Sequence, residues 1–373
     1  MRKNLISYIA PSAPATRRPA AGDEWFLRPE IGFTPNWYHQ ILGIDFGEKW
    51  HTDPRYRYKT ILEMREELRR RFPGTRIGRT DEPDFPPDLL TGVYGACSIA
   101  AIYGIPIIYS KNNWPVSAHK FLNDREADSL VSPGLDENPH FQELMSQADQ
   151  IQAIAGKIEG FINWQGVLNN AHRLRGQELF TDMMINPERA LRIFDCVSNT
   201  MIEAAERLQK RQMDTGVEVG FITLSNCLVN MVSPEEYAAM LLPFDQRIAA
   251  VFRIAGVHNC AWNANPYLES YRRIREIGYL DMGIESDLAK AKSLFPDTRR
   301  AIMYTPMDLA NKSMKQLKSD AVQIAMDYGP CDIVVADIEA GTPDEKIGAF
   351  YQICREISIK SPQLLNPEDF GSS

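Results

Sequence analysis

The chain has 373 residues, of which 44% are hydrophobic and 24% charged, and it carries a net charge of −8. This composition is typical of a globular protein with a sizeable core, and the acidic balance argues against nucleic-acid binding, which needs a basic face. No apolar run approaches the ~18 residues of a membrane span. Six cysteines without a spacing pattern indicate reduced thiols, so we expect a cytoplasmic protein that has no membrane partner.

The N-terminal part of the chain is expected to lie outside the catalytic domain. Residues 1–22, rich in Ala, Pro and Arg, predict an arm, and residues 23–91 predict a capping extension. Within that extension, residues 25–58 are dense in aromatic residues and turn formers. They predict no regular element but a packed cap, folded over a barrel mouth or into the interface of a homodimer. Residues 58–72 have the apolar spacing of an amphipathic helix, and residues 73–91 predict a loop.

From residue 92 onward, short apolar runs alternate with longer stretches of helical periodicity. The runs that predict strands are 92–99, 104–109, 158–164, 217–224, 251–258, 279–285, 300–305 and 332–338. The stretches that predict helices are 141–156, 187–213, 234–249, 266–277, 287–294, 309–328 and 343–358. A succession of about eight βα units predicts an α/β fold, a single (β/α)8 TIM barrel over residues 92–373.

One pair of residues suggests a metal site. His258 and Cys260 stand two apart where a predicted strand gives way to a loop. Residues i and i+2 of an extended segment point the same way, so the imidazole and the thiolate can converge on one soft cation, for which zinc is the best fit. The alternative is a buried cysteine beside a hydrogen-bonded histidine.

In a barrel of this kind the active site lies at the C-terminal ends of the strands. Glu285 and Asp337 stand at two such ends and are candidate metal ligands and catalytic carboxylates; the alternative is that they are ordinary rim or helix-cap residues. The polar residues near strand ends that are candidates for substrate binding are Asn163, Asn226, Tyr304 and His172.

Several motifs resemble those of one enzyme superfamily. They are residues 174–178 (LRGQE), 233–237 (SPEEY), 258–260 (HNC) and 341–347 (GTPDEKI). Over roughly residues 90 to 358 the chain resembles the uroporphyrinogen decarboxylase superfamily, especially its cobalamin-linked methyltransferase branch. The resemblance implies a (β/α)8 barrel. It also implies a zinc ion, held by the H-x-C pair and a later cysteine, that activates an acceptor thiol. The thiolate takes a methyl group from a methylcorrinoid on a partner protein.

The sequence departs from that pattern at the third ligand. The position at which the family has its later cysteine falls at Ala336 and Asp337. Cys331 is near, but it should enter its strand at the N-terminal end, on the wrong face of the barrel. The third and fourth ligands therefore stay open among Cys331, Asp337 and Glu339, with the carboxylates preferred. Glu285 resembles the glutamate that joins such a site in cobalamin-independent methionine synthases.

Two other functions are compatible with the sequence. One is a metal-free, decarboxylase-like lyase that acts on a tetrapyrrole or another polyacid, whose carboxylates would be held by Arg28, Arg55, Arg57 and Lys111. The N-terminal Arg-rich motif of the decarboxylases is not matched at residues 30–38. The other is a barrel without catalysis that docks a corrinoid or porphyrin protein. Methyl transfer between a corrinoid and a small-molecule acceptor or donor is the preferred hypothesis.

Overall fold

The computed structural model describes residues 25–79 and 87–364, so the arm expected at residues 1–22 lies outside the described residues. A six-stranded parallel sheet with the order β1-β8-β7-β6-β5-β4 forms the centre of the fold. Its strands are β1 (Leu27–Phe33), β4 (Phe221–Ser225), β5 (Ile254–His258), β6 (Ile277–Met282), β7 (Arg299–Met303) and β8 (Cys331–Ile338). The predicted α/β class is confirmed.

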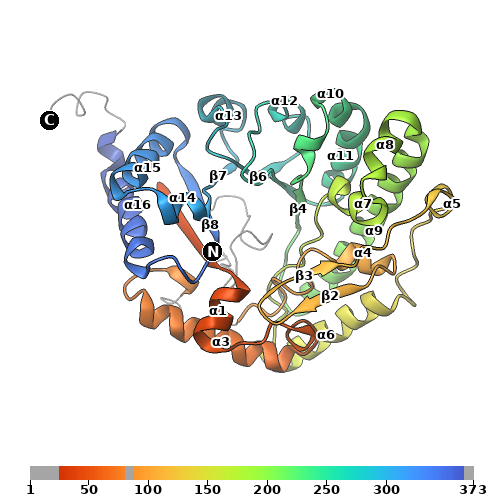
Figure 1. Cartoon of the computed structure of the whole chain (residues 1–373), viewed down its shortest axis with the longest axis horizontal. Coiled ribbons are helices and arrows are strands. Elements are labelled where there is room, and N and C mark those ends of the chain that lie inside the picture. The colour runs from red at the N-terminus through yellow and green to blue at the C-terminus, as the bar shows by residue number, and fades with distance from the viewer. Residues whose placement is uncertain (1–24, 80–86, 365–373) are drawn as a thin grey trace.

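Helices form an outer ring around these strands (Figure 1). In the N-terminal part they are α1 (Pro35–Leu42), α2 (Glu48–Thr52), α3 (Pro54–Arg71), α4 (Ser98–Ile102), α5 (Asp124–Asp128) and α6 (Pro139–Ala155). Then come α7 (Val167–Arg175), α8 (Glu178–Ile185), α9 (Pro187–Met213), α10 (Pro234–Glu236), α11 (Leu242–Val251) and α12 (Leu268–Tyr271). The last are α13 (Leu288–Leu294), α14 (Pro306–Asn311), α15 (Met314–Tyr328) and α16 (Asp344–Leu364).

Alternate residues of β4, β6, β7 and β8 pack into two different cores. In β7, Ile302 belongs to the large core shared with the helices, whereas Ala301 and Met303 belong to a second cluster on the opposite face. We call the face with the second cluster the inner face. A parallel sheet that is buried on both faces is typical of α/β proteins. The cluster consists of Phe161, Val217, Val219, Phe221, Tyr279, Ala301, Met303, Val334 and Ala336.

Three of the predicted barrel strands are not strands of this sheet. Residues 92–99 form turns and the start of α4, and residues 158–164 contain no strand. Residues 104–109 contribute instead to a separate antiparallel hairpin of β2 (Ile107–Ser110) and β3 (Asn113–Ser117). An antiparallel partner only a short turn away is easier to reach than a crossover partner. In place of these three, β1 pairs in parallel with β8 along nearly its whole length.

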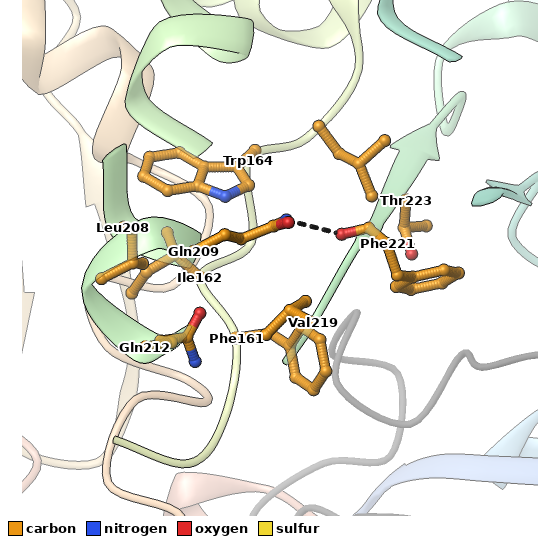
Figure 2. A pocket seen from close by; sticks show the side chains of 10 residues that line it. Phe161, Ile162, Trp164, Leu208, Gln209, Gln212, Val219, Phe221 and Thr223 are labelled. Atoms are coloured by element: carbon orange, nitrogen blue, oxygen red, sulfur yellow. Dashed lines mark hydrogen bonds between the residues drawn. The ribbon is translucent and has the colours of Figure 1, made fainter. Parts of the chain in front are cut away.

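Where a strand was predicted at residues 158–164, side chains of α9 bond the backbone. Gln209 Nε2 donates to the carbonyl of Phe221 in β4 (2.8 Å), as Figure 2 shows. Gln212 Nε2 donates to the carbonyls of Ile158 (3.0 Å) and Gly160 (2.8 Å). Side-chain amides thus satisfy backbone carbonyls that a strand ladder would otherwise bond. A pocket lies at this joint, lined by Phe161, Ile162, Trp164, Leu208, Gln209, Gln212, Val219, Phe221, Ile222 and Thr223.

The aromatic segment at residues 25–58 is ordered, which corrects the expectation that it has no regular element. It contains β1, α1 and α2, and its rings form a packed row within the chain's own core. Phe33 and Trp37 have ring centroids 4.3 Å apart, and those of Phe46 and Trp50 are 5.3 Å apart. The strand β1, within the range expected as a capping extension, therefore belongs to the main sheet. The homodimer stays a prediction.

From α6 onward the helices largely follow the predicted stretches, except that α7 and α8 lie where no helix is predicted. The stretch 187–213 matches α9 residue for residue, and the capping box that Ser233 and Glu236 form at the start of α10 is present. The stretch 266–277 is shorter in the structure, because α12 ends at Tyr271 and β6 already begins at Ile277. In the described part of the chain, no helix combines the length and the apolar character needed to cross a membrane.

Candidate metal centre

Three side chains converge where β4 and β5 end. The metal-binding atoms of Cys227, His258 and Cys260 all lie within 4.8 Å of one another. The two strands are parallel neighbours in which Ser225 is the partner of His258. Cys227 therefore stands two residues beyond Ser225, as Cys260 stands two residues beyond His258. Matched register thus brings a thiol from each strand to the same place.

An asparagine lies between the strand end and the cysteine in both segments, and both asparagines are buried. The backbone N–H of Asn226 donates to the carbonyl of His258 (2.7 Å), and its side chain donates to Asp245 on α11 (3.1 Å). The amide oxygen of Asn259 accepts from the hydroxyl of Tyr271 on α12 (2.8 Å). The two asparagine side chains are therefore bonded to residues of the helix layer, which holds both turns in position.

The imidazole of His258 is oriented by a buried carboxylate. His258 Nδ1 lies 2.6 Å and 2.9 Å from the two carboxylate oxygens of Asp281, its register partner on β6. Asp281 also accepts from the backbone N–H of Asn259 (2.9 Å) and the hydroxyl of Tyr279 (3.0 Å). An ionised carboxylate only accepts hydrogen bonds. Nδ1 is therefore the donor, and Nε2 presents the lone pair that a metal requires.

The second ring nitrogen of His258 faces a thiol. Cys260 Sγ lies 3.1 Å from His258 Nε2. The backbone φ of Cys260 is 58°, in the left-handed region that non-glycine residues seldom occupy. Strained backbone of this kind is concentrated at functional sites. Gly283, just after β6, allows the turn that contains Ala261 to approach closely, because a Cβ at this position would lie only 2.1 Å from the carbonyl oxygen of Ala261.

The chemistry of the three donors fits a metal ion. Two thiolates and one imidazole are soft and borderline ligands, the set that proteins use for zinc. Asp281 behind His258 supplies the outer carboxylate that such histidines usually have. Three protein ligands leave a fourth coordination position for a substrate, which is the pattern of catalytic zinc sites. The described residues therefore hold a possible Cys/His/Cys metal site.

The predicted carboxylate ligands do not belong to this group. Glu285 is exposed and lies beyond the end of β6, and Asp337 is half-buried within β8. Glu339 accepts hydrogen bonds from Thr34 (3.2 Å) and Asn36 (3.1 Å). Cys331 is the first residue of β8, at the opposite end of a parallel strand, and burial raises the pKa of its thiol. The roles assigned to Glu285 and Asp337 stay predictions.

The predicted substrate-binding residues lie in several different surroundings. Asn163 accepts from the backbone and side chain of Gln165 (both 3.1 Å), and the hydroxyl of Tyr304 donates to Asp320 on α15 (2.5 Å). His172 on α7 contacts Gln177 at 3.3 Å, and burial lowers its pKa. Their role in substrate binding, like that of Asn226, stays a prediction.

The helix layer behind the site contains a buried acid. Asp245 accepts from the hydroxyl of Tyr237 (2.7 Å) as well as from Asn226 (3.1 Å). Burial raises the pKa of Asp245 to about 6, and it also raises the pKa of Tyr237. Because Asp245 anchors Asn226 next to Cys227, a change at this acid acts on the position of a candidate ligand.

Two residues of the site were missed from the sequence. Cys227 directly follows Asn226, a predicted strand-end residue, and the similarity of its segment (SNC) to residues 258–260 (HNC) is the signal in the sequence. Asp281 lies inside the predicted strand 279–285, whose candidate ligand is Glu285 at its end. Cross-strand register, which joins Ser225, His258 and Asp281, identifies both.

No protein-family model matches the chain, and no curated protein matches it. Among solved structures, a methyltransferase from Methanosarcina mazei has a TM-score of 0.62 to this chain at 14% sequence identity. The match covers 90% of this chain and 94% of that one. At such an identity the likeness shows a common fold and does not by itself assign an activity. The chain is thus similar in fold, over nearly its whole length, to that methyltransferase.

Proposed function

We propose that this chain is a metal-dependent methyltransferase of the uroporphyrinogen decarboxylase superfamily. It would transfer a methyl group between a methylcorrinoid, held by a partner protein, and an acceptor thiol. The observation that carries the proposal is the convergence of Cys227, His258 and Cys260 at the ends of two neighbouring strands. The fold similarity to a methyltransferase supports it. We also propose that the parallel sheet is part of a (β/α)8-type barrel in which irregular segments occupy some strand positions.

The residues of the site have separate tasks in this proposal. Cys227 and Cys260 supply two thiolates and the negative charge, and His258 supplies a neutral nitrogen whose direction is fixed by Asp281. When bound, zinc would act as a Lewis acid that keeps an acceptor thiol in its thiolate form at neutral pH. Cys227 and Cys260 are half-buried, so each keeps part of its surface accessible to solvent.

The metal-free lyase has less support from the same residues. Arg28 bonds Asp332 (2.9 Å) and Glu30 within the sheet, and Arg57 is fully buried, where it donates to the carbonyls of Trp50 and Leu89. A guanidinium held inside the protein by such partners is not available for a substrate carboxylate. Arg28 and Arg57, two of the four basic residues that the lyase would need, are therefore engaged within the protein.

The experiment is a methyl-transfer assay with methylcobalamin as donor and small thiols as acceptors, followed by the absorbance change of the corrinoid. Zinc-loaded protein should catalyse the transfer, and both the Cys227→Ser variant and chelator-treated protein should lose it. Cys331→Ser is the matched control, since Cys331 is a buried thiol at the far end of β8. Transfer that survives both Cys227→Ser and removal of the metal would refute the proposal. In the same assay, Glu285→Gln and Asp337→Asn test the two predicted carboxylates.

A further inference from the structure

We propose that, in the metal-free protein, Cys260 and Cys227 form a peroxide-reactive dithiol that oxidises to a disulfide. This modification site uses two of the ligands of the proposed metal centre but does not depend on methyl transfer. It predicts a second state of the same site, in which the sulfurs are joined to each other and cannot bind a metal. The argument rests on the placement of the two thiols, on the side chain beside one of them, and on the contrast with the other cysteines.

The backbone places the two cysteines within reach of each other. Their sulfurs lie within 4.8 Å, and each cysteine stands two residues past the paired residues Ser225 and His258. Neighbouring strands are about 4.8 Å apart, and disulfides join residues whose Cα atoms are about 4.4–6.8 Å apart. The two sulfurs, already within 4.8 Å of each other, would have to approach to the about 2.0 Å of an S–S bond.

The side chains around the pair give the two thiols different roles. His258 Nε2 lies 3.1 Å from Cys260 Sγ, and Asp281 holds the other ring nitrogen at 2.6 Å. A cysteine next to a histidine that is oriented by a third group is the arrangement of an activated nucleophile. Cys260 is therefore the thiol that reacts first, and Cys227 is the resolving thiol that closes the disulfide.

The other cysteines lack these features. Cys97, Cys196, Cys331 and Cys354 are all buried, whereas Cys227 and Cys260 are half-buried. Burial is the largest cause that raises the pKa of each of those four thiols. Oxidation by a peroxide requires access to the sulfur, which burial denies to these four cysteines. The four buried cysteines thus serve as internal controls within the same chain.

The reaction is balanced with a hydroperoxide as the oxidant. The sulfur of Cys260 attacks one peroxide oxygen, the O–O bond breaks, and a sulfenic acid and water are formed when the peroxide is hydrogen peroxide. The sulfur of Cys227 then attacks the sulfenic sulfur; the S–S bond forms, the S–O bond breaks, and a second water leaves. Two thiols are oxidised and one peroxide is reduced, and a small dithiol reverses the change.

The test uses full-length protein from which metal has been removed by a chelator, treated with hydrogen peroxide and then analysed by thiol alkylation and intact mass. Two of the six cysteine thiols should be lost, with one disulfide-linked pair of peptides that contain Cys227 and Cys260. Cys227→Ser should stop at a sulfenic acid on Cys260 that a dione probe traps. Cys196→Ser should behave like the unchanged chain, and prior addition of zinc should protect both thiols.

The proposal would be overturned if all six thiols stayed reduced, if the disulfide joined another pair, or if the sulfenic acid formed on a different cysteine. Its failure is distinguishable from failure of the proposed function. A protein that forms this disulfide but never binds zinc would refute the metal-dependent enzyme and leave the dithiol standing. A protein that binds zinc and transfers methyl groups, but resists oxidation after the metal is removed, would refute the dithiol alone.

Discussion

Asp281→Asn is expected to weaken zinc binding without removing any ligand. The carboxylate accepts three kinds of hydrogen bond, from His258 Nδ1 (2.6 Å), Asn259 N (2.9 Å) and the hydroxyl of Tyr279 (3.0 Å). An amide has one acceptor oxygen and one donor group. If the amide NH2 faces His258, the histidine must accept at Nδ1 and carry its proton on Nε2, where it blocks the metal. If the NH2 faces Asn259, a buried backbone N–H loses its partner.

The expected losses of zinc affinity and of folding stability can be estimated from these two orientations. Changes to the outer partner of a ligating histidine cost about 10–100-fold in metal affinity, which corresponds to about 1.4–2.7 kcal/mol. A buried donor left without a partner costs about 1–3 kcal/mol of folding stability. In either orientation a neutral amide replaces the carboxylate that raises the basicity of the ligating imidazole, so zinc affinity should fall by about 1.4–2.7 kcal/mol. Folding stability should fall as well where the N–H of Asn259 loses its partner.

The assay is competition for zinc against a chromophoric chelator, together with urea unfolding of the metal-free protein. Asp88→Asn is the matched control, because Asp88 is also buried and accepts three hydrogen bonds, from Leu90 and Thr91, that involve none of the ligands. The control should lose stability and keep its zinc affinity. Equal zinc affinity in Asp281→Asn and the unchanged chain would refute the reasoning, because the imidazole would then not depend on Asp281 for its tautomer.

Three further predictions test separate parts of the account. Cys227→Ser should lower zinc affinity by more than about 100-fold, the upper cost of losing an outer partner of a ligand. Cys331→Ser should leave the zinc affinity measured by chelator competition unchanged. The folded-state pKa of Asp245, about 6, is above its ordinary value of 3.8, so the unfolding free energy should fall on the order of 2 kcal/mol as pH rises from 4 to 6. Asp245→Asn should abolish that part of the pH dependence in urea titrations, and an identical profile would contradict it. Gly283→Ala should displace the carbonyl of Ala261, which would lie only 2.1 Å from the new Cβ. Zinc uptake should fall although all three ligands are still present, and unchanged uptake would contradict this prediction.

The sequence predicted those elements whose local pattern agrees with their surroundings. Helix α9 has an Asn-Pro-Glu start and a long amphipathic period, and strands β4 to β8 are short apolar runs between helices. The strand predicted at 158–164 is absent, and its own residues do not indicate this. Gln212 of α9 bonds the carbonyl of Gly160, and Gln209 bonds that of Phe221 in the neighbouring β4. Strand β1 was not predicted, because its segment is rich in aromatic residues and turn formers. It contains Pro29, which is tolerated because β1 lies at an edge of the sheet.

Half of the candidate site could be read from the chain and half could not. The spacing of His258 and Cys260 is local and predicts their convergence directly. Cys227 lies about thirty residues earlier in the chain than this pair and joins it only through the pairing of Ser225 with His258. Asp281 depends in the same way on the pairing of β5 with β6. Register between neighbouring strands is a tertiary property, and periodicity within one strand does not encode it.

The most direct test of the metal centre is anomalous X-ray scattering at the zinc edge from crystals of the protein purified without added metal. We expect one peak bonded to all three side chains, about 2.3 Å from the sulfurs of Cys227 and Cys260 and about 2.0 Å from His258 Nε2. A peak that contacts Glu285 or Asp337 in place of Cys227 would restore the carboxylate ligands predicted from the sequence. No peak at this position, in crystals also soaked with zinc, would contradict the metal centre itself.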